Sequence, residues 1–220
     1  MSGSGMSAGS HLRKLAAPAS APPDGAEEER CEMCGELIAP THRHLLDLQK
    51  RRLLCACRAC SLLFDRSTAG GIHYRLVPDR CLRIADFDLD DVRWNSLSIP
   101  VGLAFVFDSS AAERPVAFYP GPMGATESAL KLETWSDIVE RNPVLAGMEP
   151  DVEALLVNRA KGEHDHWIVG VDKCYELVGL IRTRWRGFAG GEEVWQEIEQ
   201  FFDGLRGQAK AVTREGERLR

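Results

Sequence analysis

The sequence predicts an α+β protein in two parts: a small N-terminal four-cysteine module, then a larger domain with an antiparallel sheet and C-terminal helices. Five of the seven cysteines fall between positions 31 and 60, which places the small module. Downstream, apolar runs come in pairs joined by short polar connections, which is typical of β-hairpins. Two segments near the C-terminus carry apolar residues at helical spacing. With 220 residues, the chain can hold one sizeable core besides the module.

Composition divides the chain into four segments. Residues 1–30 are rich in Ser, Gly, Ala, Pro and Glu. They hold too few apolar side chains to offset the entropy of ordering, so we expect a disordered tail. The cysteine-rich metal-binding module then spans 31–71, the α+β domain spans 72–206, and a flexible tail spans 207–220.

The elements of the N-terminal module alternate between cysteine turns and a hairpin. Two short apolar runs flank the basic residues Lys50, Arg51 and Arg52, so we predict two paired strands with a solvated turn. Contact of this basic tip with phosphate or an acidic partner is the alternative. The expected order is a cysteine turn at 31–35, strands at 44–48 and 52–56, a second cysteine turn at 57–60, a short helix at 61–64 and a loop at 65–71.

The second domain reads as hairpins and helices. Asp88 is a candidate N-cap for its first helix, and Pro143 ends the second one, because a residue before proline disfavours helical geometry. Since the strands come mostly as hairpins, we expect an antiparallel sheet. Strands are predicted at 72–77, 101–107, 115–119, 152–159 and 167–171, a rigid loop at 120–125, and helices at 88–97, 132–141, 173–186 and 192–205.

Charge is distributed unevenly along the chain. The formal net charge is −6, from 27 basic and 33 acidic side chains. Residues 31–80 carry 8 basic and 5 acidic side chains, whereas residues 81–220 carry 16 and 24. A dedicated nucleic-acid binder usually has a stronger basic field, so we expect a protein partner and no nucleic acid.

The cysteine count and the lack of long apolar segments suggest a compartment. No window approaches about 18 uninterrupted apolar residues, so no membrane span is expected. The N-terminal residues lack the apolar stretch of a secretion signal, and we expect a cytoplasmic protein. In a reducing compartment, clustered cysteines indicate a metal site more than a disulfide framework.

The candidate metal ligands are Cys31, Cys34, Cys57 and Cys60, in the pattern C-x2-C-x20-C-x-C-x2-C. A tetrahedral metal takes four soft ligands at about 2.3 Å, and each C-x2-C turn can direct two sulfurs inward. Gly35 suits the tight turn after the first pair. Zinc is the default metal for such a closed sulfur site, and iron is the alternative.

Three further donors lie close to the four cysteines in the sequence. Cys55 could replace one ligand or make an iron–sulfur cluster feasible, but we interpret it as a small buried residue at a strand end. Either His42 or His44 could serve as an alternative ligand. With four cysteines present, we interpret both histidines as solvated or structural.

Catalytic residues are not indicated. Cys174 is near His164 and His166 in the sequence, and a Cys–His pair can build a nucleophile. However, Cys174 begins an apolar helix face, and the two histidines belong to a polar turn. Cys81 stands alone. No phosphate loop, serine elbow or dinucleotide fingerprint occurs, so the sequence favours a protein that is not an enzyme without deciding the matter.

The order of knuckle, hairpin, knuckle and helix resembles the treble-clef and zinc-ribbon families. The resemblance covers residues 31–64 and implies a metal held by the four cysteines. A C-x2-C-G knuckle also resembles rubredoxin, in which four such sulfurs hold a redox-active iron. Ser61 follows the second knuckle where rubredoxin has glycine, and Arg58 lies inside it, which weakens that comparison.

Several longer stretches resemble an uncharacterised, mainly actinobacterial family that is often encoded beside the genes of an uptake nickel–iron hydrogenase. The similarity runs from about residue 30 to 206. The resemblance implies a zinc-binding accessory or adaptor protein for maturation or assembly of the hydrogenase; the alternative is a rubredoxin-like iron electron-transfer protein that serves it. It implies no catalytic residues. The stretches lie at 31–35, 53–60, 74–80, 99–105, 116–120, 150–157, 174–178 and 185–188.

Overall fold

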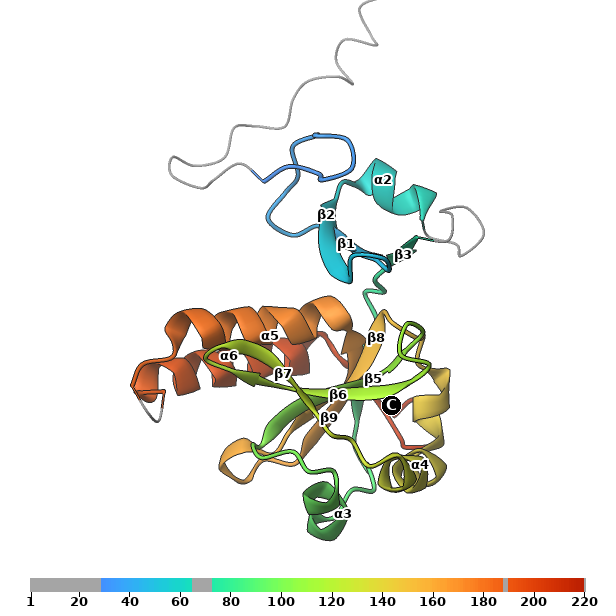
Figure 1. Cartoon of the computed structure of the whole chain (residues 1–220), viewed down its shortest axis with the longest axis vertical. Coiled ribbons are helices and arrows are strands. Elements are labelled where there is room, and N and C mark those ends of the chain that lie inside the picture. Colours follow the sequence, from blue (N-terminus) through green and yellow to red (C-terminus); the bar gives the residue numbers. More distant parts are fainter. Residues whose placement is uncertain (1–28, 65–72, 188–189, 220) are drawn as a thin grey trace, which may run out of the picture.

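The computed structural model describes residues 29–64, 73–187 and 190–219 (Figure 1). The disordered tail expected at 1–30 falls almost wholly outside the described residues, and the loop expected at 65–71 falls wholly outside them. The remaining residues form an α+β structure with two antiparallel-rich sheets and C-terminal helices, as the sequence predicts.

The N-terminal module is a small three-stranded sheet with one short helix. Strands β1 (Arg43–Asp47) and β2 (Arg52–Ala56) form the predicted hairpin, with His44 opposite Cys55. Helix α2 (Arg58–Leu63) follows β2 directly. Strand β3 (Tyr74–Leu76) pairs with β1, so this sheet extends beyond the boundary expected at 71.

The second domain is built on a seven-stranded sheet in the order β10-β4-β9-β8-β5-β6-β7. Neighbouring strands are antiparallel except β10 and β4, which run parallel. The expected hairpin that joins the central strands is confirmed, since β8 and β9 pair along six residues each. The strands are β4 (Cys81–Ile84), β5 (Leu103–Ser109), β6 (Arg114–Gly121), β7 (Gly124–Ser128), β8 (Glu153–Asn158), β9 (Asp165–Gly170) and β10 (Lys210–Val212).

Helices cover both faces of this sheet. The long C-terminal pair lies on one face, and the other two α-helices lie on the opposite side (Figure 1). Every residue of β8 and β9 is therefore buried, including polar residues at the strand ends such as Glu153 and Asp165. The helices are α3 (Asp91–Ser96), α4 (Leu132–Arg141), α5 (Val171–Arg184) and α6 (Glu192–Gln208), with short 3-10 turns η1 (Pro143–Gly147) and η2 (Ala160–Gly162).

Two hydrophobic cores lie on the two sides of the sheet. Alternate residues of each strand point to opposite faces. On β9, Trp167 packs toward the core beneath α5 and α6, and it stacks on Phe202 with ring centroids 5.0 Å apart. Ile168, its neighbour, packs into the other core with Trp135 and Ile138 of α4.

Two local expectations in the second domain are corrected by the structure. The rigid loop expected at 120–125 is a tight hairpin turn, because β6 continues to Gly121 and pairs with β7 from Gly124. Helix α3 begins at Asp91 and takes Asp90 as its N-cap in place of Asp88, since the Asp90 carboxylate accepts from the amide of Arg93.

The segment 207–219 is also not a flexible tail. It completes α6 and then adds β10 as an edge strand beside β4. Val212 is buried in the core with α4, which supplies the apolar contact that holds the strand in place. The backbone amide of Leu219 further donates to the carbonyl of Ala211 at 3.0 Å.

The hairpin of the N-terminal module packs directly on the second domain. Leu46 and Leu53 contact the core beneath α5 and α6. The side chain of His44 bonds to Asp172 in the first turn of α5, with 3.0 Å between Nδ1 and Oδ2. The linker between the two parts, residues 77–80, runs close to Gly170, where an added Cβ would meet the carbonyl oxygen of Pro78 at 2.8 Å. A residue without a side chain at position 170 therefore permits this close approach.

None of the helices in the described part of the chain is long and apolar enough to cross a membrane.

His166 should make stability depend on pH. It is buried on β9, stacks on Phe87 at 4.3 Å, and its Nε2 has no hydrogen-bond partner. Burial, aided by the charge of Arg159, lowers the pKa of His166 to about 3, against 6.5 ordinarily. Below pH 6.5 the unfolded chain therefore binds a proton at this histidine that the folded chain does not bind. The free energy of unfolding falls as the pH is lowered from 6.5 toward about 3.

The expected slope from this histidine is up to about 1.4 kcal/mol per pH unit. Urea denaturation of His166→Phe between pH 7 and 4 should show a smaller loss of stability than the wild type. The neighbouring, exposed His164 provides the control, since His164→Gln should keep the wild-type slope. Equal slopes for all three proteins would contradict the assignment.

Candidate metal centre

The first cysteine turn is shaped by its own backbone. The amide of Gly35 donates to the carbonyl of Cys31 at 2.8 Å, and the amide of Cys31 donates to Glu36 at 2.8 Å. Gly35 has φ +79°, a left-handed conformation that glycine adopts without steric cost. This turn brings Cys31 and Cys34 to the same side.

The second cysteine turn is the start of α2. Cys57 is the N-cap of the helix, and its sulfur accepts from the amide of Cys60 at 3.4 Å. The carbonyl of Cys57 accepts from the amide of Ser61 at 2.9 Å. As the N-cap residue, Cys57 thus has its sulfur directed toward a backbone N–H group of the first helical turn.

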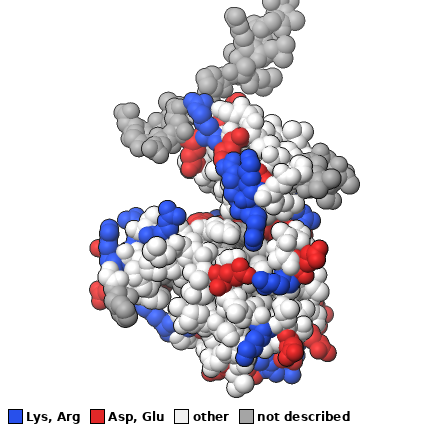
Figure 2. Space-filling model, viewed as in Figure 1, with Lys and Arg blue, Asp and Glu red and all other residues white. Residues whose placement is uncertain are grey.

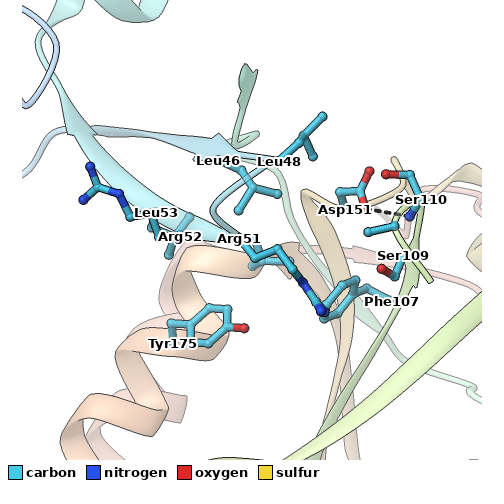
Figure 3. A pocket seen from close by; sticks show the side chains of 12 residues that line it. Leu46, Leu48, Arg51, Arg52, Leu53, Phe107, Ser109, Ser110, Asp151 and Tyr175 are labelled. Carbon is cyan, nitrogen blue, oxygen red and sulfur yellow. Dashed lines mark hydrogen bonds between the residues drawn. The ribbon is translucent and has the colours of Figure 1, made fainter. Parts of the chain in front are cut away.

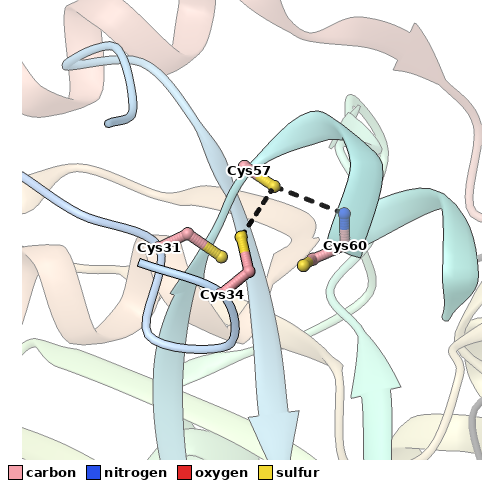
Figure 4. A group of neighbouring side chains, drawn as sticks. All are labelled: Cys31, Cys34, Cys57 and Cys60. Atoms are coloured by element: carbon pink, nitrogen blue, oxygen red, sulfur yellow. Dashed lines mark hydrogen bonds between the residues drawn. The ribbon is translucent and has the colours of Figure 1, made fainter. Parts of the chain in front are cut away.

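The structure brings the four predicted cysteines together. One Sγ atom from each of them lies within 4.8 Å of all the others. The sulfurs of Cys34 and Cys57 are 3.6 Å apart, close to the separation of about 3.8 Å that a tetrahedral metal with bonds of about 2.3 Å requires. Figure 4 shows the four side chains converging on one point from the two turns. These residues could hold a metal ion.

The acid–base properties of the four thiols differ with their surroundings. Burial raises the pKa of Cys31, but backbone hydrogen bonds from Cys57, Met33 and Cys34 outweigh burial and bring it to about 6. Burial and the neighbouring thiols raise the pKa of Cys60 to about 12. Four thiolates this close repel one another, so a bound cation is what would allow all four to be deprotonated, with release of protons.

The cluster is closed on one side and open on the other. Cys31 and Cys60 are buried against Leu45, Leu54 and Ala56, which form the inner face of the hairpin. Cys34 is exposed on the outer side. The cysteines and the hairpin therefore share one small hydrophobic core, and an ion at this place would connect both turns to the sheet.

A second cluster of potential ligands lies on the opposite face of the hairpin. His42, His44 and Cys55 each place one donor atom within 4.8 Å of the other two. The sequence interpretation treated these three residues separately and missed the cluster. The available signal was the spacing His-x-His before a strand, together with the pairing of His44 opposite Cys55 that the predicted hairpin implies.

The remaining candidate residues are not brought together. Among the described residues, no group of three or more metal-ligating side chains includes Cys81, Cys174, His164 or His166. Cys174 is fully buried, and burial raises the pKa of its thiol well above the ordinary value. A buried thiol with a raised pKa is a weak nucleophile.

The basic tip of the hairpin is exposed at all three of its residues, as the sequence predicts. Figure 2 shows basic side chains gathered on the N-terminal module and extending toward the second domain. Lys50 is exposed, but Arg52 forms an ion pair with Glu32 at 2.8 Å. Arg51 has φ +51° and points toward the second domain, beside Phe107 (Figure 3).

A pocket of about 350 Å³ lies between the hairpin turn and the second domain. Its volume falls in the range of small-molecule sites, roughly 300–1,000 Å³. Asp151 is fixed at one side, since it accepts from the amide of Ser110 at 2.8 Å. The pocket depends on how the two parts pack, so the sequence could not indicate it. Its lining comprises Leu46, Leu48, Arg51, Arg52, Leu53, Phe107, Ser109, Ser110, Ala111, Asp151, Val171 and Tyr175.

Comparison with known proteins assigns a family. One family model matches residues 30–209, which include both cysteine turns and the seven-stranded sheet up to its last strand. The chain belongs to DUF5947, a family of unknown function. The DUF5947 match begins at Arg30, directly before Cys31, so the four-cysteine cluster lies inside the family region. No curated protein and no solved structure matches the chain.

Proposed function

We propose that this protein is a zinc-binding accessory or adaptor protein, linked to the maturation or assembly of a nickel–iron hydrogenase, without catalytic activity of its own. The observation that carries the proposal is the four-cysteine cluster, with one sulfur from each residue within 4.8 Å of the others. Four protein thiolates leave no open position on a tetrahedral ion, which is the arrangement of structural zinc sites.

The position of the cluster supports a scaffolding role for the metal. It joins Cys31 and Cys34 to the base of the hairpin, and the hairpin itself packs on the second domain through Leu46 and Leu53. A bound ion would thereby fix the exposed Lys50 end of the hairpin relative to the pocket beneath it. A rigid surface of this kind reduces the entropy cost of binding a partner.

The link to the hydrogenase is supported by the resemblance of the chain to a family encoded beside hydrogenase genes. The partner would be a hydrogenase subunit or a maturation factor, met in the cytoplasm. The more basic N-terminal part and the more acidic second domain offer charges of both signs for recognition. Complementary charges raise association rates and select partners more than they raise affinity.

Iron at the same four sulfurs is the alternative. The observation that favours it is the exposure of Cys34, which places one ligand at the surface where an electron could leave. In that case the protein would carry electrons to or from the hydrogenase. Ser61 after the second knuckle is the sequence feature that speaks against this alternative.

Metal content and visible absorption, measured on untagged protein purified without oxygen, distinguish zinc from iron. We expect zinc in the four-cysteine site and a colourless protein, because zinc is a d10 ion. Iron with charge-transfer bands that bleach on reduction would overturn the adaptor proposal and make electron transfer the working function.

The role in cells can be tested with a strain that lacks this gene and expresses the hydrogenase. We expect hydrogenase activity to fall in the deletion strain and to return with the wild-type gene. A gene with Cys34→Ser should not restore it, whereas Cys81→Ser should, since Cys81 belongs to no ligand cluster among the described residues. Unchanged hydrogenase activity in the deletion strain would contradict the proposal.

A further inference from the structure

The geometry points to a second metal site, made by His42, His44 and Cys55 on the face of the hairpin that is turned toward the second domain. Their three donor atoms lie within 4.8 Å of one another. Two imidazoles and one thiolate suit a borderline-soft transition metal such as Zn²⁺, with a fourth position left for water or a partner's side chain. This inference goes beyond the proposed function and does not depend on which metal the four-cysteine cluster holds.

Strand geometry explains why the three residues meet. His44 lies directly opposite Cys55 in the β1–β2 ladder, and such pairs have Cβ atoms about 4.5–5.5 Å apart. His42 precedes His44 by two residues, and the two rings lie with centroids 4.8 Å apart. The inner residues of the hairpin, Leu45 and Leu54, point to the opposite face, so the two clusters occupy different sides of one sheet.

Both histidines are oriented as metal ligands usually are. His44 Nδ1 lies 3.0 Å from Oδ2 of Asp172, and His42 Nδ1 lies 2.9 Å from the carbonyl oxygen of Ala39. A carboxylate or carbonyl at Nδ1 fixes the proton there and leaves the lone pair of Nε2 for a metal. Both histidines are therefore in the tautomer that carries its proton on Nδ1, because a carbonyl oxygen or a carboxylate accepts a hydrogen bond and does not donate one.

The surroundings of His42 point to a bound ion independently of the clustering of the three donor atoms. Its side chain is only 9% exposed. Its Nε2 is nevertheless buried without a hydrogen-bond partner among the described residues. Leaving a buried nitrogen unpaired is unfavourable, because it has lost its hydrogen bonds to water. A metal ion bound at this atom would satisfy it.

Charge and access also favour a cation here. Besides Asp172, the carboxylate of Glu29 lies 3.5 Å from His42 Nδ1, and Glu32 accepts from the backbone amide of Cys55 at 2.8 Å. His42 and His44 also line a broad cleft of about 1090 Å³ between the two parts of the protein. The cleft provides an entry path and space for a fourth ligand.

The test uses the full chain, and the metal content of its four-cysteine cluster is measured beforehand. The result for the second site is then separate from the test of the proposed function. Co²⁺ is added without oxygen, and the visible spectrum is recorded. We expect one added equivalent to give a thiolate-to-cobalt band and the ligand-field bands of a four-coordinate ion, both removed by Zn²⁺. A wild-type protein that takes up no added equivalent would overturn the inference.

Variants assign the bound ion to these residues. Cys55→Ser should abolish the thiolate band, and His42→Gln should weaken binding strongly. Asp172→Asn should weaken it about 10–100-fold, because a carboxylate behind a ligating histidine raises its basicity. The exposed His73 and the unclustered Cys81 are the controls, and His73→Gln and Cys81→Ser should bind like the wild type. Unaltered binding in Cys55→Ser would show an adventitious surface site and overturn the assignment.

A measurement on the wild type keeps the inference testable if a variant does not fold. The proton NMR spectrum of the Co²⁺-loaded protein should contain two exchangeable, strongly shifted signals, one from each Nδ1–H of His42 and His44. Fewer than two such signals would contradict the site.

Discussion

Changing Cys34 to serine is expected to release the metal from the four-cysteine cluster and to unfold the N-terminal module. The sulfur of Cys34 lies 3.6 Å from that of Cys57 and completes the set of four. A structural zinc contributes about 10–16 kcal/mol to the folding of such a module. That is as large as the total stability of a typical domain, about 5–15 kcal/mol, so the small core around Leu45 cannot replace it.

The measurement is metal content by mass spectrometry together with limited proteolysis of the N-terminal module. Cys60→Ser should behave like Cys34→Ser, since both remove one ligand. Cys81→Ser is the matched control and should leave this metal in place, because Cys81 lies on β4 in the other sheet. Full metal content in Cys34→Ser would show that the ligand assignment is wrong.

The second large effect is expected at the ion pair that anchors the linker between the two parts. Arg80 Nε donates to Glu153 Oε1 at 2.6 Å, and its NH2 group also bonds to Glu153 and to the carbonyl of Gly147. The carboxylate of Glu153 is only 1% exposed. Arg80→Met leaves this buried charge without its cation, which typically costs about 3–5 kcal/mol.

We expect Arg80→Met to lower the free energy of unfolding by an amount near the lower end of that range, because the amide of Glu149 still donates to Glu153 at 2.9 Å. Chemical denaturation of the single variants and of Arg80→Met with Glu153→Leu gives the coupling between the two charges. The double variant should recover much of the loss, since it leaves no buried charge.

An exposed ion pair on the same domain provides the control for Arg80→Met. Arg114 and Glu127 lie 2.9 Å apart, but their side chains are 42% and 45% exposed. Arg114→Met should therefore cost only about 0–1 kcal/mol. An equal loss of unfolding free energy in Arg80→Met and Arg114→Met would show that the burial of Glu153 does not strengthen its ion pair.

The four-cysteine cluster was predictable because its members are local in sequence. Each C-x2-C turn positions two sulfurs through short backbone contacts, such as that of Gly35 to Cys31, and a hairpin of ordinary length joins the turns. The apolar strands and the helix periodicity of the second domain were equally clear. The hairpin of β8 and β9 and the helix Leu132–Arg141 lie where the sequence predicts them.

The elements that were missed are short and lack a periodic pattern of their own. Strand β10 has three residues, and it is held by pairing with β4, more than 120 residues earlier in the chain, and by burial of Val212. Strand β7 is polar along much of its length and follows Pro120 and Gly121, so composition favours a loop. Pairing with β6 makes it a strand.

The sequence by itself determined the α+β class, the four-cysteine cluster and the central hairpins, because each depends on residues that are close in sequence or on a repeating apolar pattern. Only the tertiary structure decided how the hairpin meets the second domain. That contact places His44 against Asp172 and turns Arg51 toward a pocket. These features join residues up to 128 positions apart, and such distances are set by packing, which local patterns do not encode.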